Sequence, residues 1–144
     1  MNITSGYQLE QPQVLVPWGI SEEQLQELFR GSELRRVKDG YFITSCTSLC
    51  GLSHNLGFRF SSRDGALYAF DLSGNGGGSL EASYRKFQSH LETTFGPPTE
   101  TSPGEEEGLP SRIWRIKDVQ IIHAVQEHFG PAESLRITKS KPSS

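Results

Sequence analysis

The chain has 144 residues and a formal net charge of −3. This length fits one domain, which we expect over residues 1–144. The acidic balance argues against a nucleic-acid binder, because such proteins gain most of their affinity by neutralising phosphates. No apolar stretch is long enough to span a bilayer, and no basic and apolar leader follows Met1, so we expect no membrane partner and a cytoplasmic location.

The N-terminal region predicts an arm followed by a capped helix. We expect residues 1–12 to form a loose arm and 14–16 to form a short strand ended by proline. Ser21 and Gln24 stand at the two positions of a capping box, and Gly31 can end the helix in a left-handed conformation. The apolar side chains of this helix share one face: Leu25, Leu28 and Phe29.

Strand-like runs follow the first helix and are joined by tight turns. Asp39-Gly40 and Asp64-Gly65 are strong hairpin signals between such runs. In the third run, Leu56, Phe58 and Phe60 alternate with small or polar residues, which predicts one buried and one wet face. The predicted strands of this meander are 34–37, 41–44, 56–60 and 67–72.

A second amphipathic helix is predicted over residues 80–95 and ends at Gly96. Residues 99–111 are rich in Pro, Gly, Glu, Ser and Thr and predict a surface loop. Strands are expected at 112–117, 119–126 and 134–138, followed by a polar tail over 139–144. The apolar stripe of the second helix is Leu80, Tyr84, Phe87, Leu91 and Phe95.

These elements together predict an α+β fold. We expect an antiparallel sheet of about six or seven strands with two amphipathic helices on one face. A helix followed by a meander occurs in each half, which indicates an α-then-β-meander unit used twice.

Cys46, Cys50 and His54 are the candidates for metal or nucleophilic chemistry. Zinc sites use Cys and His ligands, and a Cys–His pair can form a nucleophile. The spacing of four suits a helix, however, whereas residues 44–55 do not have a helical pattern. We therefore expect buried or half-buried thiols and keep a small enzyme or metal-binding protein as the alternative. Alternation in 121–125 predicts that His123 faces outward or is semi-buried.

Two loops could also carry function. The glycine-rich segment 74–79 lies between a strand and a helix but lacks the Lys-Ser/Thr ending of a phosphate-binding loop, so we interpret it as a linker. Glu105, Glu106 and Glu107 form the strongest cluster of charge in the sequence. We predict that this acidic loop contacts a protein partner, because charge complementarity promotes fast and selective association.

The chain resembles a known group of proteins in its helix signals. Trp18-Gly19-Ile20-Ser21 is followed by Leu25, an aromatic residue and a glycine end each helix, and a meander comes next. This pattern resembles small bacterial helix-plus-meander proteins, among them the lipoprotein BamE, the β-lactamase inhibitor protein and immunity proteins of toxin systems. It covers residues 14–138 and carries over no site residue. We expect a departure from BamE, because the residues after Met1 have no signal-peptide pattern and no lipidation cysteine near the start.

Together these observations predict a non-catalytic protein-binding module that needs no cofactor. The most concrete form of this hypothesis is a bacterial immunity protein that inhibits a cognate toxin. A secretion chaperone or adaptor is a further alternative, because it would also bind a protein without chemistry of its own.

Overall fold

A computed structural model describes residues 1–74, 78–103, 109–126 and 132–140, without the side chain of Gln126. The elements in chain order are β1 (Gly6–Leu9), β2 (Val14–Pro17), α1 (Glu22–Leu28), β3 (Arg35–Lys38), β4 (Tyr41–Ser48), β5 (Leu52–Phe60), β6 (Leu67–Ser73), α2 (Leu80–Phe95), β7 (Glu100–Ser102), β8 (Ser111–Ile116), β9 (Val119–Gln126) and β10 (Ala132–Lys139). Within these residues, no helix is long and apolar enough to cross a membrane.

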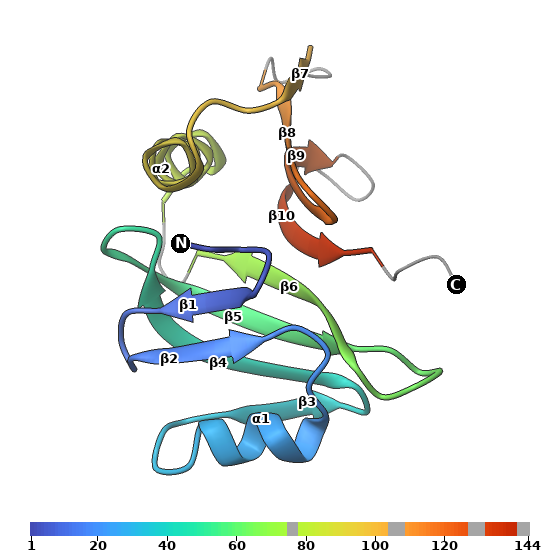
Figure 1. Cartoon of the computed structure of the whole chain (residues 1–144). Coiled ribbons are helices and arrows are strands. Elements are labelled where there is room, and N and C mark those ends of the chain that lie inside the picture. The colour runs from blue at the N-terminus through green and yellow to red at the C-terminus, as the bar shows by residue number, and fades with distance from the viewer. Residues whose placement is uncertain (75–77, 104–108, 127–131, 141–144) are drawn as a thin grey trace.

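Eight strands form one antiparallel sheet in the order β3-β4-β5-β6-β10-β9-β8-β7, and β1 and β2 form a separate hairpin (Figure 1). Helix α1 precedes the meander β3–β6, and helix α2 precedes the meander β7–β10. The last strands of the two meanders, β6 and β10, pair antiparallel in the middle of the sheet. The α+β class is therefore confirmed, and the connectivity of the first half recurs in the second.

The predicted number of six or seven strands in the sheet is wrong, because the unexpected β7 adds an eighth strand. Strand β1, which pairs with β2 in the separate hairpin, was also not expected. Residues 1–12 are not a loose arm: β1 pairs with β2, and Ile3, Tyr7 and Leu9 are buried. Strand β7 lies inside the predicted loop 99–111 and pairs with β8. Both strands are short, and each depends on a partner strand rather than on a local pattern.

The helix ends follow from their capping residues. Ser21 accepts a hydrogen bond from the amide of Gln24 at 3.2 Å, and the Gln24 side chain accepts one from the Ser21 amide at 2.9 Å, which confirms the predicted capping box. Ser79 caps α2 by accepting from the amide of Ala82 at 3.0 Å. Gly96 follows α2 with a φ of 83°, a conformation that a residue with a side chain rarely adopts.

A chain of aromatic rings ties α1 and the hairpin to the sheet. Phe58 of β5 lies between Phe29, which follows α1, and Phe70 of β6, with ring centroids 5.5 and 5.8 Å apart. Tyr7 and Trp18 pack on Phe70 at 5.2 and 4.8 Å. Helix α2 packs on the same face of the sheet, where Phe87 contacts rings on β5 and β9. The core therefore lies on one face of the sheet.

The other face of the eight-stranded sheet has half-buried or exposed side chains. Its buried positions are three small residues, Gly57, Ala69 and Ala124. We call this surface the open face. The strand registers place on it, from β3 to β7, Arg35, Lys38, Tyr41, Ile43, Ser45, Thr47, Ser53, Asn55, Gly57, Arg59, Ala69, Asp71, Ser73, Ser134, Arg136, Thr138, Gln120, Ile122, Ala124, Ile113, Arg115 and Glu100.

Candidate functional site

Cys46 lies on β4, Cys50 lies in the turn between β4 and β5, and His54 lies on β5. Cys46 stands opposite His54, with 3.8 Å between its sulfur and Nε2 of the imidazole. Cys50 is exposed in the turn, where the Thr94 hydroxyl of α2 donates to its sulfur at 3.6 Å. Within the described parts of the chain, no three His, Cys, Asp or Glu side chains gather closely enough to hold a metal ion.

A directional chain of buried hydrogen bonds surrounds His54. Its Nδ1 donates to the carbonyl of Asn55 at 2.9 Å, so Nε2 of the neutral ring accepts from the Ser48 hydroxyl at 2.6 Å. Ser48 accepts in turn from the Tyr7 phenol at 2.6 Å. Ser48 and His54 have the geometry of a nucleophile and its base, but both are 0% exposed. A substrate cannot reach them, and the chain of bonds satisfies polar groups of the core.

The two thiols are expected to react very differently. Burial raises the pKa of Cys46 to about 12, so at pH 8 it is a neutral thiol, whereas Cys50 is exposed. We predict that iodoacetamide modifies Cys50 in the native protein and modifies Cys46 only after unfolding. Peptide mass spectrometry of native and urea-treated samples checks this. Equal labelling of both thiols in the native protein would contradict the burial of Cys46.

His54 is expected to make stability depend on pH. Burial lowers the pKa of His54 from its ordinary 6.5 and outweighs the hydrogen bond to Asn55. The unfolded chain then binds a proton more readily, so this contribution is complete above pH 6.5 and is lost as pH falls towards the lower folded pKa. In urea titrations at pH 7.5 and 5.5, we expect H54Q to reduce the loss of stability. H90Q serves as the control, and an unchanged loss in H54Q would contradict the assignment.

A second polar network joins α2 to β9 and β10 through His123. The Gln88 amide donates to Glu92 at 2.9 Å, which leaves its oxygen to accept from Nδ1 of His123 at 2.9 Å. Nε2 of His123 lies 2.5 Å from Glu133, and the Ser83 hydroxyl donates to the same carboxylate at 2.5 Å. His123 is 0% exposed, so the prediction that it faces outward or is semi-buried is wrong. Buried polar partners make this inward position possible.

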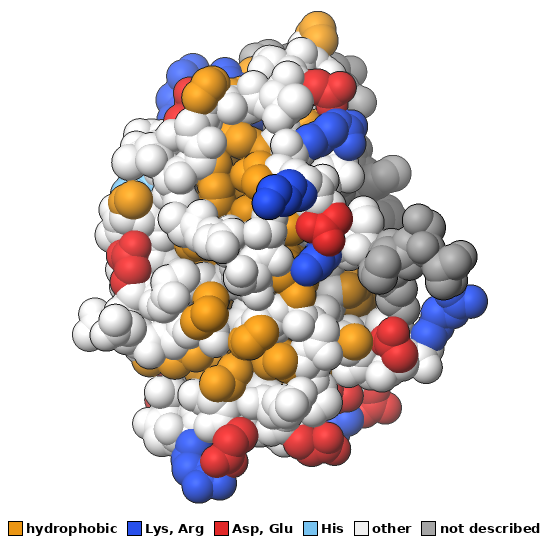
Figure 2. Space-filling view, viewed as in Figure 1, with side chains coloured by type: hydrophobic (Ala, Val, Ile, Leu, Met, Phe, Trp, Pro, Cys, Tyr) orange, Lys and Arg blue, Asp and Glu red, His pale blue; other side chains and the backbone are white. Residues whose placement is uncertain are grey.

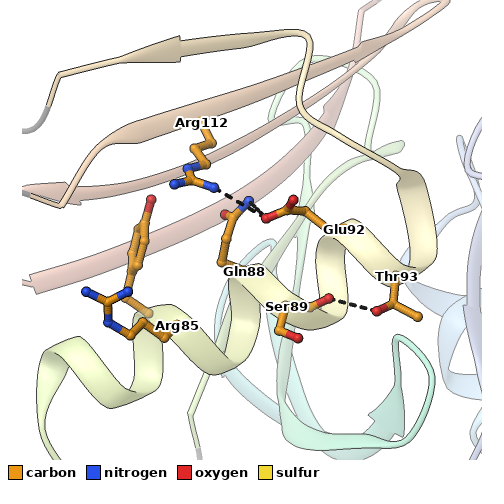
Figure 3. Close-up of a pocket in the computed structure, with 7 residues that line it drawn as sticks. Arg85, Gln88, Ser89, Glu92, Thr93 and Arg112 are labelled. Atoms are coloured by element: carbon orange, nitrogen blue, oxygen red, sulfur yellow. Dashed lines mark hydrogen bonds and ion pairs between the residues drawn. The ribbon is translucent and has the colours of Figure 1, made fainter.

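A groove of about 530 Å³ lies beside this network, between α2 and β8. Arg112 of β8 reaches towards Glu92 of α2, at 3.3 Å (Figure 3). On the other flank, Arg85 pairs with Glu81 at 2.8 Å. Both arginines therefore pair with carboxylates of the same chain, whereas the buried Nε of Arg112 has no hydrogen-bond partner among the described residues.

The open face carries a cluster that we name the Tyr–Arg cluster: Tyr41, Arg59, Asp71 and Arg136. Nε of Arg59 lies 2.5 Å from one oxygen of Asp71, and Nε of Arg136 lies 2.7 Å from the other. The guanidinium of Arg59 also lies 4.7 Å from the centre of the Tyr41 ring, within range of a cation–π interaction. Since Arg136 belongs to β10 and Asp71 to β6, the cluster spans the junction of the two meanders.

The environment fixes the charge state of this cluster. Burial lowers the pKa of Arg59, but the hydrogen bond and negative charge of Asp71 outweigh it, so the net shift is upward. Burial, followed by the charge of Asp71, raises the pKa of the Tyr41 phenol. The cluster thus combines two guanidinium groups, one carboxyl group and one neutral phenol on central strands of the sheet.

Gly57 makes room for the cluster. A Cβ atom at this position would lie 2.1 Å from the Tyr41 hydroxyl and 2.7 Å from the ring carbon that bears it. Any larger residue would therefore displace the Tyr41 ring from its place over β5. Glycine at this position thus lets the Tyr41 ring lie over β5, and the reason is this close approach and not the backbone, since the φ of Gly57 is not among the positive values.

Sequence reasoning singled out none of the four cluster residues. The alternation around Phe58 predicts that Arg59 is on a wet face, but its carboxylate partner Asp71 lies 12 residues away along the chain, and Asp71 and Arg136 are separated by 65. The predicted contact residues Glu105, Glu106 and Glu107 lie outside the described residues, as does part of the glycine-rich segment. Their role in binding stays a prediction.

No family model, curated protein or solved structure matches this chain. The resemblance to helix-plus-meander proteins therefore stays a prediction.

Proposed function

We propose that the protein is a non-catalytic binding module whose open face holds a protein partner. The observation that carries the proposal is the Tyr–Arg cluster, which lies on the central strands of a broad sheet surface. Tyrosine and arginine are enriched among the residues that dominate protein interfaces. Hydrogen bonds to Asp71 already orient both guanidinium groups, so binding costs less conformational entropy.

The groups with catalytic chemistry support the same proposal. Ser48, His54 and His123 are 0% exposed and take part in hydrogen bonds within the core. The open face carries instead guanidinium, ammonium, carboxylate, phenol, amide and hydroxyl groups, which can hold a partner through charge and hydrogen bonds. In its most specific form, the proposal is a cytoplasmic immunity protein that covers the active site of a bacterial toxin.

Toxin neutralisation tests this proposal. Secreted effector domains encoded beside this chain would be expressed in a heterologous host, alone and together with it. We expect one of them to arrest growth and the chain to restore growth. Restoration should weaken with R136A and persist with R85A, a matched control whose arginine also forms an exposed ion pair but lies on α2.

The outcomes separate the functional classes. If the chain neutralises no effector but binds a non-toxic secreted client, the protein is an adaptor and the immunity proposal fails. If R85A and R136A behave alike, the open face is not the interface. For the purified complex, we expect R136A to weaken affinity by about ten-fold, equivalent to about 1.4 kcal/mol.

A further inference from the structure

We propose that the partner presents an acidic protein surface, rich in Asp and Glu, to the open face. This inference rests on the proposed function, because it specifies the chemistry of the partner that the open face binds. It differs from the prediction drawn from Glu105, Glu106 and Glu107, which would favour a basic partner.

Positive charge is concentrated on the open face. By strand register, the open face carries five basic residues and two acidic ones, an excess of three positive charges. The whole chain has 14 basic and 17 acidic residues, which leaves nine basic and 15 acidic residues elsewhere. The basic residues of the open face are Arg35, Lys38, Arg59, Arg115 and Arg136, and the acidic ones are Asp71 and Glu100.

The opposite side of the molecule has a different surface. The side that bears the hairpin and helices shows acidic and basic side chains distributed around it, with hydrophobic side chains between them (Figure 2). The exposed Arg30, which follows α1, pairs with Glu27 of that helix, and the exposed Arg85 of α2 pairs with Glu81. The positive excess is thus a local property of the open face within an acidic protein.

Two features leave this positive charge available to a partner. Arg35 and Lys38, on the exposed edge strand β3, form no salt bridge with any residue in the described ranges. In the Tyr–Arg cluster, two guanidinium groups share the single carboxylate of Asp71, so one positive charge remains unneutralised. A guanidinium has five N–H donors and can still bind a partner carboxylate in a bidentate manner.

Because salt screens distant charges, the charges close to the binding surface affect binding more than the net charge of the protein does. At 0.1 M ionic strength the Debye length is about 10 Å, so a group docked on the open face interacts mainly with the charges of that face. An acidic surface therefore approaches this face favourably although the whole protein carries a charge of −3. The same reasoning predicts fast association that slows as salt is added.

Poly-L-glutamate is the probe that tests the chemistry without a known partner. Wild-type protein would be titrated with it at 0.1 M salt and followed by NMR of backbone amides and arginine side chains. We expect shifts on β3, β4, β5 and β10 that disappear at 0.5 M salt. R35Q/K38Q should weaken binding by about three- to ten-fold, as two exposed charge pairs allow. R85Q/K86Q removes the same charge from α2 and should bind like wild type.

The alternative results overturn the inference. Absence of poly-L-glutamate binding, equal effects of the two double variants, or shifts confined to α1 and α2 would each contradict an acid-binding open face. A single-stranded oligothymidylate of matched charge that binds more tightly than poly-L-glutamate would assign the face to nucleic acid instead. These outcomes are separate from toxin neutralisation, because a neutral partner could still be held by the open face and respond to R136A.

Discussion

Replacing Phe58 with alanine is expected to destabilise the fold by about 3–5 kcal/mol. Phe58 is 0% exposed and joins the ring of Phe29 to that of Phe70, so its loss leaves a cavity between α1 and the centre of the sheet. Domains of this size have total stabilities of about 5–15 kcal/mol, so this loss is a large share. Urea denaturation measures it as a lower midpoint with an unchanged slope.

An exposed residue provides the control for this cavity. Val37 is 50% exposed on β3, and V37A should change the free energy of unfolding by about 0.5 kcal/mol or less. A small effect of F58A, comparable with that of V37A, would show that the aromatic chain does not anchor the first helix and the hairpin to the sheet.

Replacing Glu133 with alanine is expected to cost about 3 kcal/mol in the second half of the fold. The substitution leaves the fully buried imidazole of His123 without its partner at Nε2, and it removes the acceptor of the Ser83 hydroxyl. Removing one member of a buried pair is costly because the other stays desolvated. E133Q keeps an oxygen at this position and should cost clearly less. Chemical denaturation of both variants gives the two free energies.

The two Glu133 variants also separate hydrogen bonding from simple loss of packing. E81A serves as the control, because Glu81 forms an exposed pair with Arg85 on α2 and such pairs contribute little. If E133A and E133Q destabilise equally and only as much as E81A, the network through His123 does not hold α2 against β9 and β10.

Local signals in the sequence predict the helices and most of the meanders correctly. Helix α2 spans the predicted residues 80–95 because its stripe of apolar residues, its Ser79 cap and Gly96 all lie within a single segment. Strand β1 was missed because Gly6–Leu9 becomes a strand only by pairing with β2. Strand β7 has three exposed residues and likewise depends on its neighbour.

Local sequence signals do not predict the Tyr–Arg cluster either, because its contacts also depend on how distant strands pair. Asp71 meets Arg59 through the register of β5 with β6, and it meets Arg136 through the pairing of β6 with β10. The register follows from the fold of both halves, and no short motif encodes it. His123 illustrates the reverse error: a polar side chain in an apolar run suggests a wet position, but Gln88 and Glu133 arrive from other elements to bind it.

Blocking one side of the molecule at a time tests whether the open face holds the protein partner. Two exposed aliphatic residues offer matched positions: Ile122 on the open face is 37% exposed, and Leu28 on α1 is 39% exposed. Each would be changed to cysteine in a C50S background and coupled to maleimide–polyethylene glycol. Affinity for the neutralised effector would then be measured. We predict that the polymer abolishes binding when attached through I122C and leaves binding intact through L28C. Binding that is retained with the polymer on I122C and lost with the polymer on L28C would place the interface on the helical side instead of the open face.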